Sequence, residues 1–201
     1  MFPEVNAKLN TVPLGVDKQI YADNPALESK DILYMGRLDQ MKGLQQFLND
    51  VEENFEMLQS LGLKVYVAGK GHLLQRVIDM HYAGKIEYLY SVSGPAKFQL
   101  LKDVKYMVFP SIYEPYGLSL NEGLSSGKIC LATSVGGHKD QIQNMVNGVF
   151  VKENQWIKTI AEVEGNKKLQ KKIVKNAHNS ANDIDVHFEK LEEVLSGILG
   201  A

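Results

Sequence analysis

Two glutamates and a stretch of main-chain donors are the first candidates for chemistry in this sequence. Glu114 and Glu122 are separated by seven residues, and between them Gly117 opens a predicted helix. The N–H groups of Gly117, Leu118 and Ser119 would be free donors at the start of that helix. Ionised carboxylates suit the adjacent hydroxyls of a sugar or a ribose. The alternative is structural, with one glutamate complementing the helix dipole and the other in solvent.

Two basic residues lie in an earlier loop, between a buried strand and a long helix. Arg37 and Lys42 fall within the loop from Gly36 to Gly43. The glycine spacing fits neither a dinucleotide fingerprint nor a Walker A loop. A helix N-terminus already favours anions, so a phosphate is the natural ligand of this loop. The alternative is a solvated Arg and Lys beside a turn.

Three further loops offer weaker candidates. Gly69-Lys70-Gly71 follows the second predicted strand, Ser91 to Pro95 with Gly94 follows the third, and Gly136-Gly137 follows the fifth. In an open parallel sheet, ligands bind beyond the carboxyl ends of the strands. Each loop could therefore contact a ligand, with the third strand's loop placed to receive a nucleobase. Each could equally be a strand-to-helix turn.

The strands and helices that must position these loops can be predicted from the pattern of apolar residues, beginning with short apolar runs bounded by turn formers. Such runs predict buried strands, here at 32–35, 65–68, 88–90, 106–109, 129–132 and 149–151. Apolar residues at spacings of three and four from Leu44 to Leu61 predict one helix of about five turns. Shorter helices are expected at 72–83, 95–103, 118–126 and 139–145, and then at 154–164, 166–180 and 184–198. Alternating strands and helices predict an α/β fold, a Rossmann-like parallel six-stranded sheet with helices on both faces.

The two ends of the chain follow a different pattern. Residues 1–28 contain three prolines and little periodicity, which predicts a connecting arm ahead of a domain over 29–201. Asp183-Ile184-Asp185 has a metal-binding form, but at the start of the last helix it is interpreted as a helix cap. The lysines of 166–180 indicate a solvated amphipathic face, with attachment to a membrane surface as the alternative.

Composition excludes several classes of protein. The 201 residues carry 22 Lys and Arg against 24 Asp and Glu, a net charge of −2, so no general field attracts nucleic acid. No apolar stretch is long enough to span a bilayer, and the first twenty residues do not resemble a signal peptide. The single cysteine, Cys130, lies in an apolar run and is interpreted as a buried core residue. These features predict a soluble cytoplasmic protein.

The candidate loops, taken in order, resemble the donor-binding C-terminal domain of GT-B glycosyltransferases. The resemblance is strongest to the large retaining group that includes glycogen and starch synthases and sucrose synthase. It rests on four motifs: Gly36-Arg37-Leu38 with Lys42-Gly43, Pro110-Ser111 with Glu114-Pro115-Tyr116-Gly117-Leu118 and Glu122, Gly136-Gly137 before an acidic residue, and Pro13-Leu14-Gly15-Val16-Asp17. It runs from about residue 11 to about residue 153.

The resemblance implies a role for each matching position. Arg37 and Lys42 would hold the diphosphate of a nucleotide sugar and stabilise the departing negative charge. Glu114 would contact hydroxyls of the transferred sugar, and Glu122 those of the ribose. The backbone of Gly117, Leu118 and Ser119 would meet the sugar and the distal phosphate. Gly36, Gly69 and Gly94 complete the predicted binding loops. Transfer with retention and without a required metal or cofactor is implied too.

The expected activity is therefore transfer of a hexosyl, in particular glucosyl, unit from a donor such as ADP-glucose or UDP-glucose to a glycan or lipid-linked acceptor. The acceptor domain of the family has no counterpart in this sequence, so it is expected in cis or in trans, and the chain alone is expected to be inactive. The alternatives are a non-catalytic nucleotide-sugar-binding or assembly module, and a nucleotide-sugar epimerase. The five histidines match no motif of the acceptor domain and are interpreted as solvated or helix-end residues.

Overall fold

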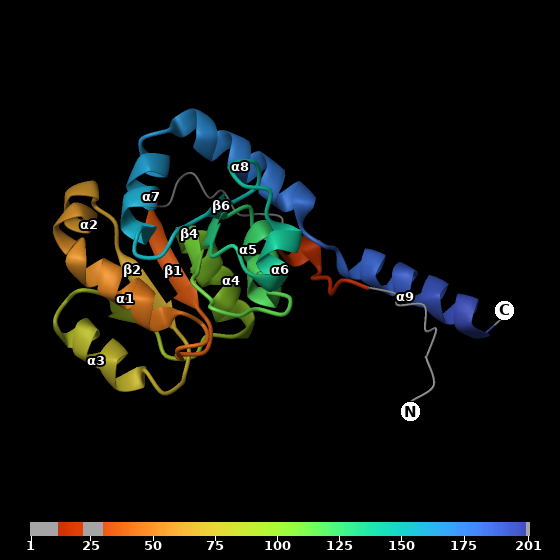
Figure 1. Cartoon of the computed structure of the whole chain (residues 1–201), viewed down its shortest axis with the longest axis horizontal. Helices are drawn as coiled ribbons and strands as arrows, with labels where there is room; N and C mark the ends of the chain where they lie inside the picture. Colours follow the sequence, from red (N-terminus) through yellow and green to blue (C-terminus); the bar gives the residue numbers. More distant parts are fainter. Residues whose placement is uncertain (1–11, 22–29, 200–201) are drawn as a thin grey trace, which may run out of the picture.

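A six-stranded parallel sheet forms the centre of the protein, in the order β3-β2-β1-β4-β5-β6. The computed structural model (Figure 1) describes residues 12–21 and 30–199. The strands are β1 (Asp31–Met35), β2 (Val65–Ala68), β3 (Glu87–Tyr88), β4 (Val104–Phe109), β5 (Ile129–Ala132) and β6 (Val149–Phe150). The predicted α/β Rossmann-like fold with six parallel strands is confirmed.

Both faces of the sheet are buried, because neighbouring residues of each strand point to opposite sides. In β1, Ile32 and Tyr34 pack into one apolar cluster and Leu33 into the other. The first cluster is covered by α1 (Leu44–Glu53), α2 (Phe55–Leu61), α3 (Leu74–Tyr82) and α7 (Trp156–Glu164), and the second by α4 (Gly94–Asp103) and α5 (Leu118–Ser125). Helix α8 (Lys167–Ser180) contributes Ile173 to the first cluster and Ala177 to the second. Cys130 is buried in the second cluster, as predicted.

Two helix predictions are wrong. The single helix expected from Leu44 to Leu61 is two helices, α1 and α2, separated at Asn54, whose φ of −114° is not helical. Its side chain donates to the main-chain oxygen of Asp50, which also accepts from the Asn54 amide, so a side-chain hydrogen bond competes with the helical one at this position. The helix expected at 139–145 is instead α6 (Gly136–Gln141). Residues beyond it form a turn in which Asn147 accepts a hydrogen bond from the Gln143 amide.

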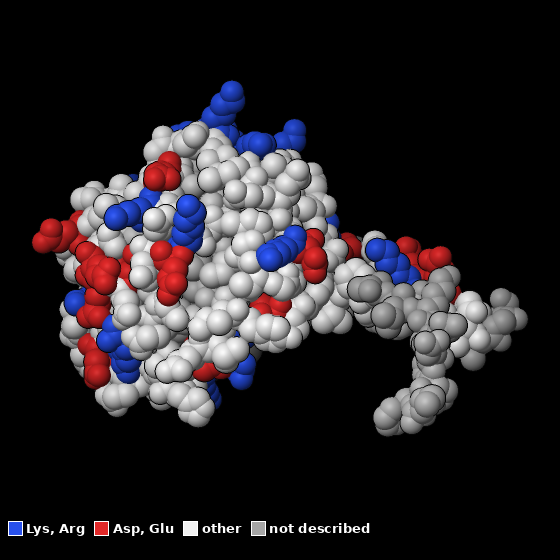
Figure 2. Space-filling view, in the orientation of Figure 1, with Lys and Arg blue, Asp and Glu red and all other residues white. Residues whose placement is uncertain are grey.

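The C-terminal helices return over the sheet and then leave it. Buried Asp50 of α1 accepts a hydrogen bond from the Ile157 amide at the start of α7, which ties the two helices together. The last helix, α9 (Ile184–Leu199), projects from the body of the protein (Figure 1). Asp183 caps it by accepting from the Asp185 amide, as predicted. Figure 2 shows basic side chains gathered over α8, whose apolar residues face the core.

The described part of the N-terminal arm packs on the domain. Val16 forms a parallel bridge with Asp183, and a short 3-10 helix, η1 (Lys18–Tyr21), brings Tyr21 into the second apolar cluster. The predicted boundary between residues 28 and 29 lies outside the described residues and stays a prediction. Over 12–21 and 30–199, no helix is both long enough and apolar enough to cross a membrane.

The amino edge of the sheet contains two buried lysines. Lys105, at the start of β4, is 2% exposed and lies 3.0 Å from Glu164 at the end of α7. Tyr106 donates to the same carboxylate oxygen, at 2.5 Å. Lys128, just before β5, is fully buried, and its Nζ has no hydrogen-bond partner in the described structure.

Candidate functional site

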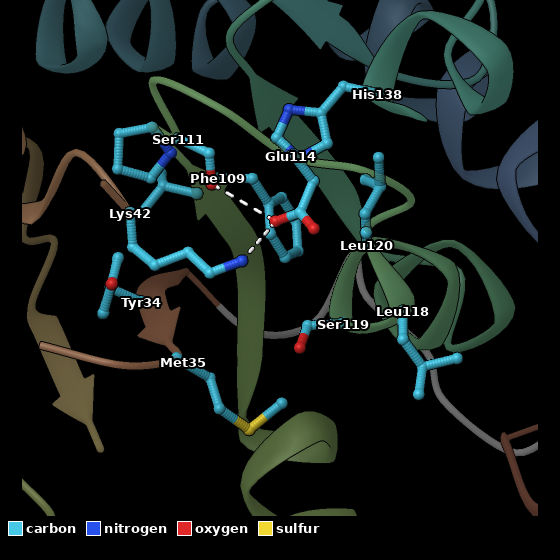
Figure 3. Close-up of a pocket in the computed structure, with 14 residues that line it drawn as sticks. Tyr34, Met35, Lys42, Phe109, Ser111, Glu114, Leu118, Ser119, Leu120 and His138 are labelled. Atoms are coloured by element: carbon cyan, nitrogen blue, oxygen red, sulfur yellow. Dashed lines mark hydrogen bonds and ion pairs between the residues drawn. The ribbon is translucent and has the colours of Figure 1, made fainter. Parts of the chain in front are cut away.

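A hollow of about 210 Å³ lies at the carboxyl ends of β1 and β4. The loops that follow β1 and β4, the first turn of α5 and His138 of α6 surround it (Figure 3). The predicted site residues that line it are Gly36, Lys42, Glu114, Gly117, Leu118 and Ser119. The topology therefore brings together residues that are up to 83 positions apart in the chain, from 36 to 119.

The loop after β1 is shaped by its own hydrogen bonds. The Asp39 side chain accepts from the Lys42 amide at 2.9 Å, and the Tyr34 hydroxyl donates to the main-chain oxygen of Arg37 at 2.6 Å. Gly43 ends the loop with a φ of +65°, where a Cβ would lie 1.7 Å from the main-chain oxygen of Pro110. Only glycine allows this close approach, which presses the first loop against the second.

Lys42 and Glu114 meet inside the hollow (Figure 3). Lys42 Nζ lies 2.5 Å from Glu114 Oε2, and Ser111 Oγ lies 3.4 Å from the same oxygen. The Lys42 side chain is 26% exposed and the Glu114 side chain is 12% exposed, so both remain within reach of a ligand. A cation and a carboxylate side by side can bind a phosphate and a sugar hydroxyl, respectively.

The first turn of α5 adds main-chain donors to the same hollow. Gly117 is the N-cap residue, and its oxygen accepts from the amides of Leu120 and Asn121. In the described structure the amides of Leu118 and Ser119 have no backbone acceptor. Free N–H groups at a helix N-terminus favour an anion, and Lys42 lines the same space.

His138 is a lining residue that the sequence interpretation missed. It is 1% exposed and lies in the last turn of α6, so of the two predicted roles the helix-end one holds and the solvated one does not. Burial lowers the pKa of His138, although the hydrogen bond with the main-chain oxygen of Thr133 and the nearby Glu114 charge oppose the shift. Burial therefore favours the neutral form of the ring. Its position directly after Gly136-Gly137, in a loop at a strand end, was the available signal.

The start of α6, which carries Gly136, Gly137 and His138, is pressed against the loop that carries Glu114. Gly136 has a φ of +35°, and a Cβ there would lie 2.1 Å from the main-chain oxygen of Glu114. The Gly137 amide donates to that same oxygen at 2.9 Å. The backbone on both sides of the hollow is thus in direct contact, which fixes the position of Glu114.

A second hollow of about 300 Å³ lies beside the first and shares Gly36 with it. Arg37 and Gly69 line it, with Lys70, Ser91 and Val92. Arg37 is 71% exposed and 3.3 Å from Asp39, so it stands at the rim of the site, away from Lys42 and Glu114. Lys70, Ser91 and Val92 all lie in loops that are candidate binding loops by their sequence.

Two predicted site residues line neither hollow. Gly94 is the first residue of α4, and Glu122 lies one turn into α5, where it pairs with Lys97. The structure therefore gathers Lys42 and Glu114 closely, places Arg37 at the neighbouring hollow, and sets Glu122 further along the helix. Among the described residues, no group of three or more His, Cys, Asp or Glu could hold a metal ion.

Comparison with known proteins agrees with this fold. The family described as "Glycosyl transferases group 1" matches residues 17–180. An uncharacterized glycosyltransferase of Methanocaldococcus jannaschii is 30% identical over 128 residues, which are 62% of this chain and 32% of that protein. The chain spans about a third of the length of this relative.

Solved structures share the fold at low sequence identity. A glycosyltransferase from Rickettsia africae superposes with a TM-score of 0.79 at 18% identity, over 96% of this chain and 57% of that one. Anabaena HepE, solved in complex with UDP-glucose, gives a TM-score of 0.76 at 16% identity, over 91% and 56%. The chain belongs to the group 1 glycosyltransferase family, and the resemblance to GT-B enzymes is confirmed.

Proposed function

We propose that this chain is the donor-binding half of a retaining glycosyltransferase, which transfers a hexosyl unit, in particular a glucosyl unit, from a nucleotide sugar to a glycan or lipid-linked acceptor. The acceptor half is supplied in cis or in trans, and the reaction takes place in the cytoplasm. The observation that carries the proposal is the convergence of Lys42, Glu114 and the free amides of α5 on one hollow.

The cationic side of the hollow acts on the leaving group. Transfer of the sugar leaves a nucleoside diphosphate whose negative charge increases in the transition state. Lys42 and the amides of Leu118 and Ser119 are fixed around the space where that charge develops. Preorganised donors of this kind stabilise the transition state more than the ground state. Arg37, at the rim, neutralises the other end of the diphosphate, so the proposed reaction needs no metal or cofactor.

Glu114 orients the transferred sugar. In the free protein, Lys42 and Ser111 both approach one of its oxygens, Oε2. When a diphosphate binds, Lys42 turns to the phosphate oxygens, and the carboxylate accepts from sugar hydroxyls instead. The His138 ring, whose neutral form burial favours, lies on the same wall and provides a further polar contact for the sugar. This assignment gives the two halves of the donor separate partners.

Calorimetric titration of the chain with ADP-glucose, UDP-glucose and GDP-mannose tests the proposal. At least one of the three is expected to bind. Glu114→Gln is expected to weaken the binding of that nucleotide sugar about tenfold. The corresponding nucleoside diphosphate, which lacks the sugar, should bind the variant no more weakly than wild type, because Lys42 no longer has to leave Glu114. Glu162→Gln, at an exposed position of α7, is the matched control. Failure of all three ligands to bind would contradict the proposal.

A further inference from the structure

The carboxylate of Glu122 is held by side chains from two other parts of the chain. Lys97 of α4 donates to Glu122 Oε1 at 2.7 Å, and the Tyr21 hydroxyl of the N-terminal arm donates to the same oxygen at 3.3 Å. Lys97 and Glu122 keep 20% and 14% of their side-chain exposure. Both of these hydrogen bonds reach Glu122 Oε1, and no described residue donates to Glu122 Oε2.

Both helices that contribute to this pair begin next to the candidate site. Glu122 is three and four residues after Ser119 and Leu118, so it lies on the same side of α5 as those lining residues. Lys97 lies in the first turn of α4, shortly after Ser91 and Val92, which line the second hollow. The ion pair therefore joins α5, whose first turn lines the first hollow, to α4, which begins just after the loop that lines the second hollow.

Tyr21 is suited to act as a permanent donor in this cluster. Burial, followed by the nearby Glu122 carboxylate, raises the pKa of the Tyr21 hydroxyl well above its usual value. The phenol therefore keeps its proton at neutral pH. Its ring packs edge-on against Phe98 at a centroid distance of 5.4 Å, which fixes its position beside Lys97. Two donors on one oxygen restrict the rotation of the carboxylate.

We propose that Lys97 is a positioning residue that anchors Glu122 through Oε1 and so presents Oε2 to the ribose hydroxyls of the donor. The inference rests on the proposed function, because it assumes that a nucleotide binds at this edge of the sheet. It adds a residue that sequence motifs do not mark. Without Lys97 the carboxylate keeps its charge but loses its fixed direction, so the preference for ribose over deoxyribose declines.

The test compares a ribonucleotide with its 2′-deoxy analogue in the full chain. UDP, ADP and GDP are titrated first by calorimetry, and the one that binds wild type most tightly is paired with its 2′-deoxy form. Wild type is expected to prefer the ribonucleotide by about tenfold. In Lys97→Met this ratio should decrease to about two, mainly through weaker binding of the ribonucleotide, and Lys97→Arg should restore most of it.

Matched variants separate this role from a general effect on folding. Lys102→Met makes the same change at an exposed position of the same helix and should leave the ratio unchanged. Tyr21→Phe removes the weaker of the two donors to Glu122 Oε1 and should lower the ratio by about twofold. An unchanged ratio in Lys97→Met overturns the inference while leaving the proposed function intact. Tighter ribonucleotide binding in Lys97→Met also overturns it, because Lys97 would then compete with the ligand. If wild type binds none of the three diphosphates, both proposals fail.

Discussion

Two lysine–glutamate pairs at opposite edges of one sheet have very different surroundings. At the carboxyl edge, Lys42 meets Glu114 in an open hollow, with Ser111 as a weak third partner. At the amino edge, Lys105 is almost completely buried, and its partner Glu164 also accepts from Tyr106 and Lys167. The first pair has few partners and can exchange them for a ligand. In the second pair, which we call the saturated pair, the Glu164 carboxylate already accepts from several side chains, and its role is to stabilise the fold.

The largest expected effect lies in the saturated pair. Glu164→Ala should lower the free energy of unfolding by about 3–5 kcal/mol, because it leaves Lys105 buried without its counter-charge. Urea denaturation measures the change. Glu162→Ala, at an exposed position two residues earlier on α7, should change stability by less than about 0.5 kcal/mol. Similar losses in the two variants would contradict the comparison.

The same carboxylate should give the protein a characteristic acid response. Burial alone would raise the pKa of Glu164, but hydrogen bonds from Tyr106, Lys167 and Lys105 outweigh it and lower the pKa from 4.5 to about 2. The stabilisation is therefore complete above pH 4.5 and is lost as the pH falls toward 2. It amounts to about 3 kcal/mol at most. Glu164→Gln, which keeps the shape but not the charge, should show a flatter loss of stability over that range.

The open pair should respond in binding instead of stability. Lys42→Met is expected to weaken binding of a nucleoside diphosphate by about 1.5–3 kcal/mol, because a charge-assisted contact to phosphate is lost. Its free energy of unfolding should change by less than about 1 kcal/mol, as for other partly exposed ion pairs. Titration calorimetry and urea denaturation of the same variant measure both. Lys171→Met, at an exposed position of α8, provides the control.

The smallest predicted effect is a gain in stability on replacing the buried Lys128. Burial lowers the pKa of Lys128 from 10.5 to about 8, so this lysine opposes folding at neutral pH. Lys128→Met should raise the free energy of unfolding by about 1–2 kcal/mol at pH 7. Because the folded state binds fewer protons between pH 8 and 10.5, wild type should recover this difference as the pH rises through that range. A variant less stable than wild type at pH 7 would show that Lys128 has a favourable role.

The positions of most strands could be predicted because their signal is local. Val65–Ala68 and Ile129–Ala132 match their predicted bounds, since a short apolar run between turn formers is complete within a few residues. Helix interruptions were harder to predict. Asn54 interrupts an apolar pattern that continues on both sides of it, so periodicity alone favours one helix.

The site was predictable in outline for a related reason. Once the strands are known, their carboxyl ends identify the loops that gather, and Lys42 and Glu114, which are 72 positions apart in the chain, meet where those loops come together. The pairing of Lys97 with Glu122 and of Lys105 with Glu164 depends on how helices pack. No local pattern contains that information. The burial of His138 likewise depends on a close contact between two loops.

The backbone contacts around the hollow also determine where this site can tolerate change. Side chains cannot be added at Gly43 or Gly136 without displacing the neighbouring loop, so those positions are closed to variation. Arg37 and Leu118, by contrast, have exposed side chains at the margin of the two hollows. Directed evolution of ligand preference should therefore concentrate its accepted substitutions at such marginal positions and reject nearly all of those at the two glycines.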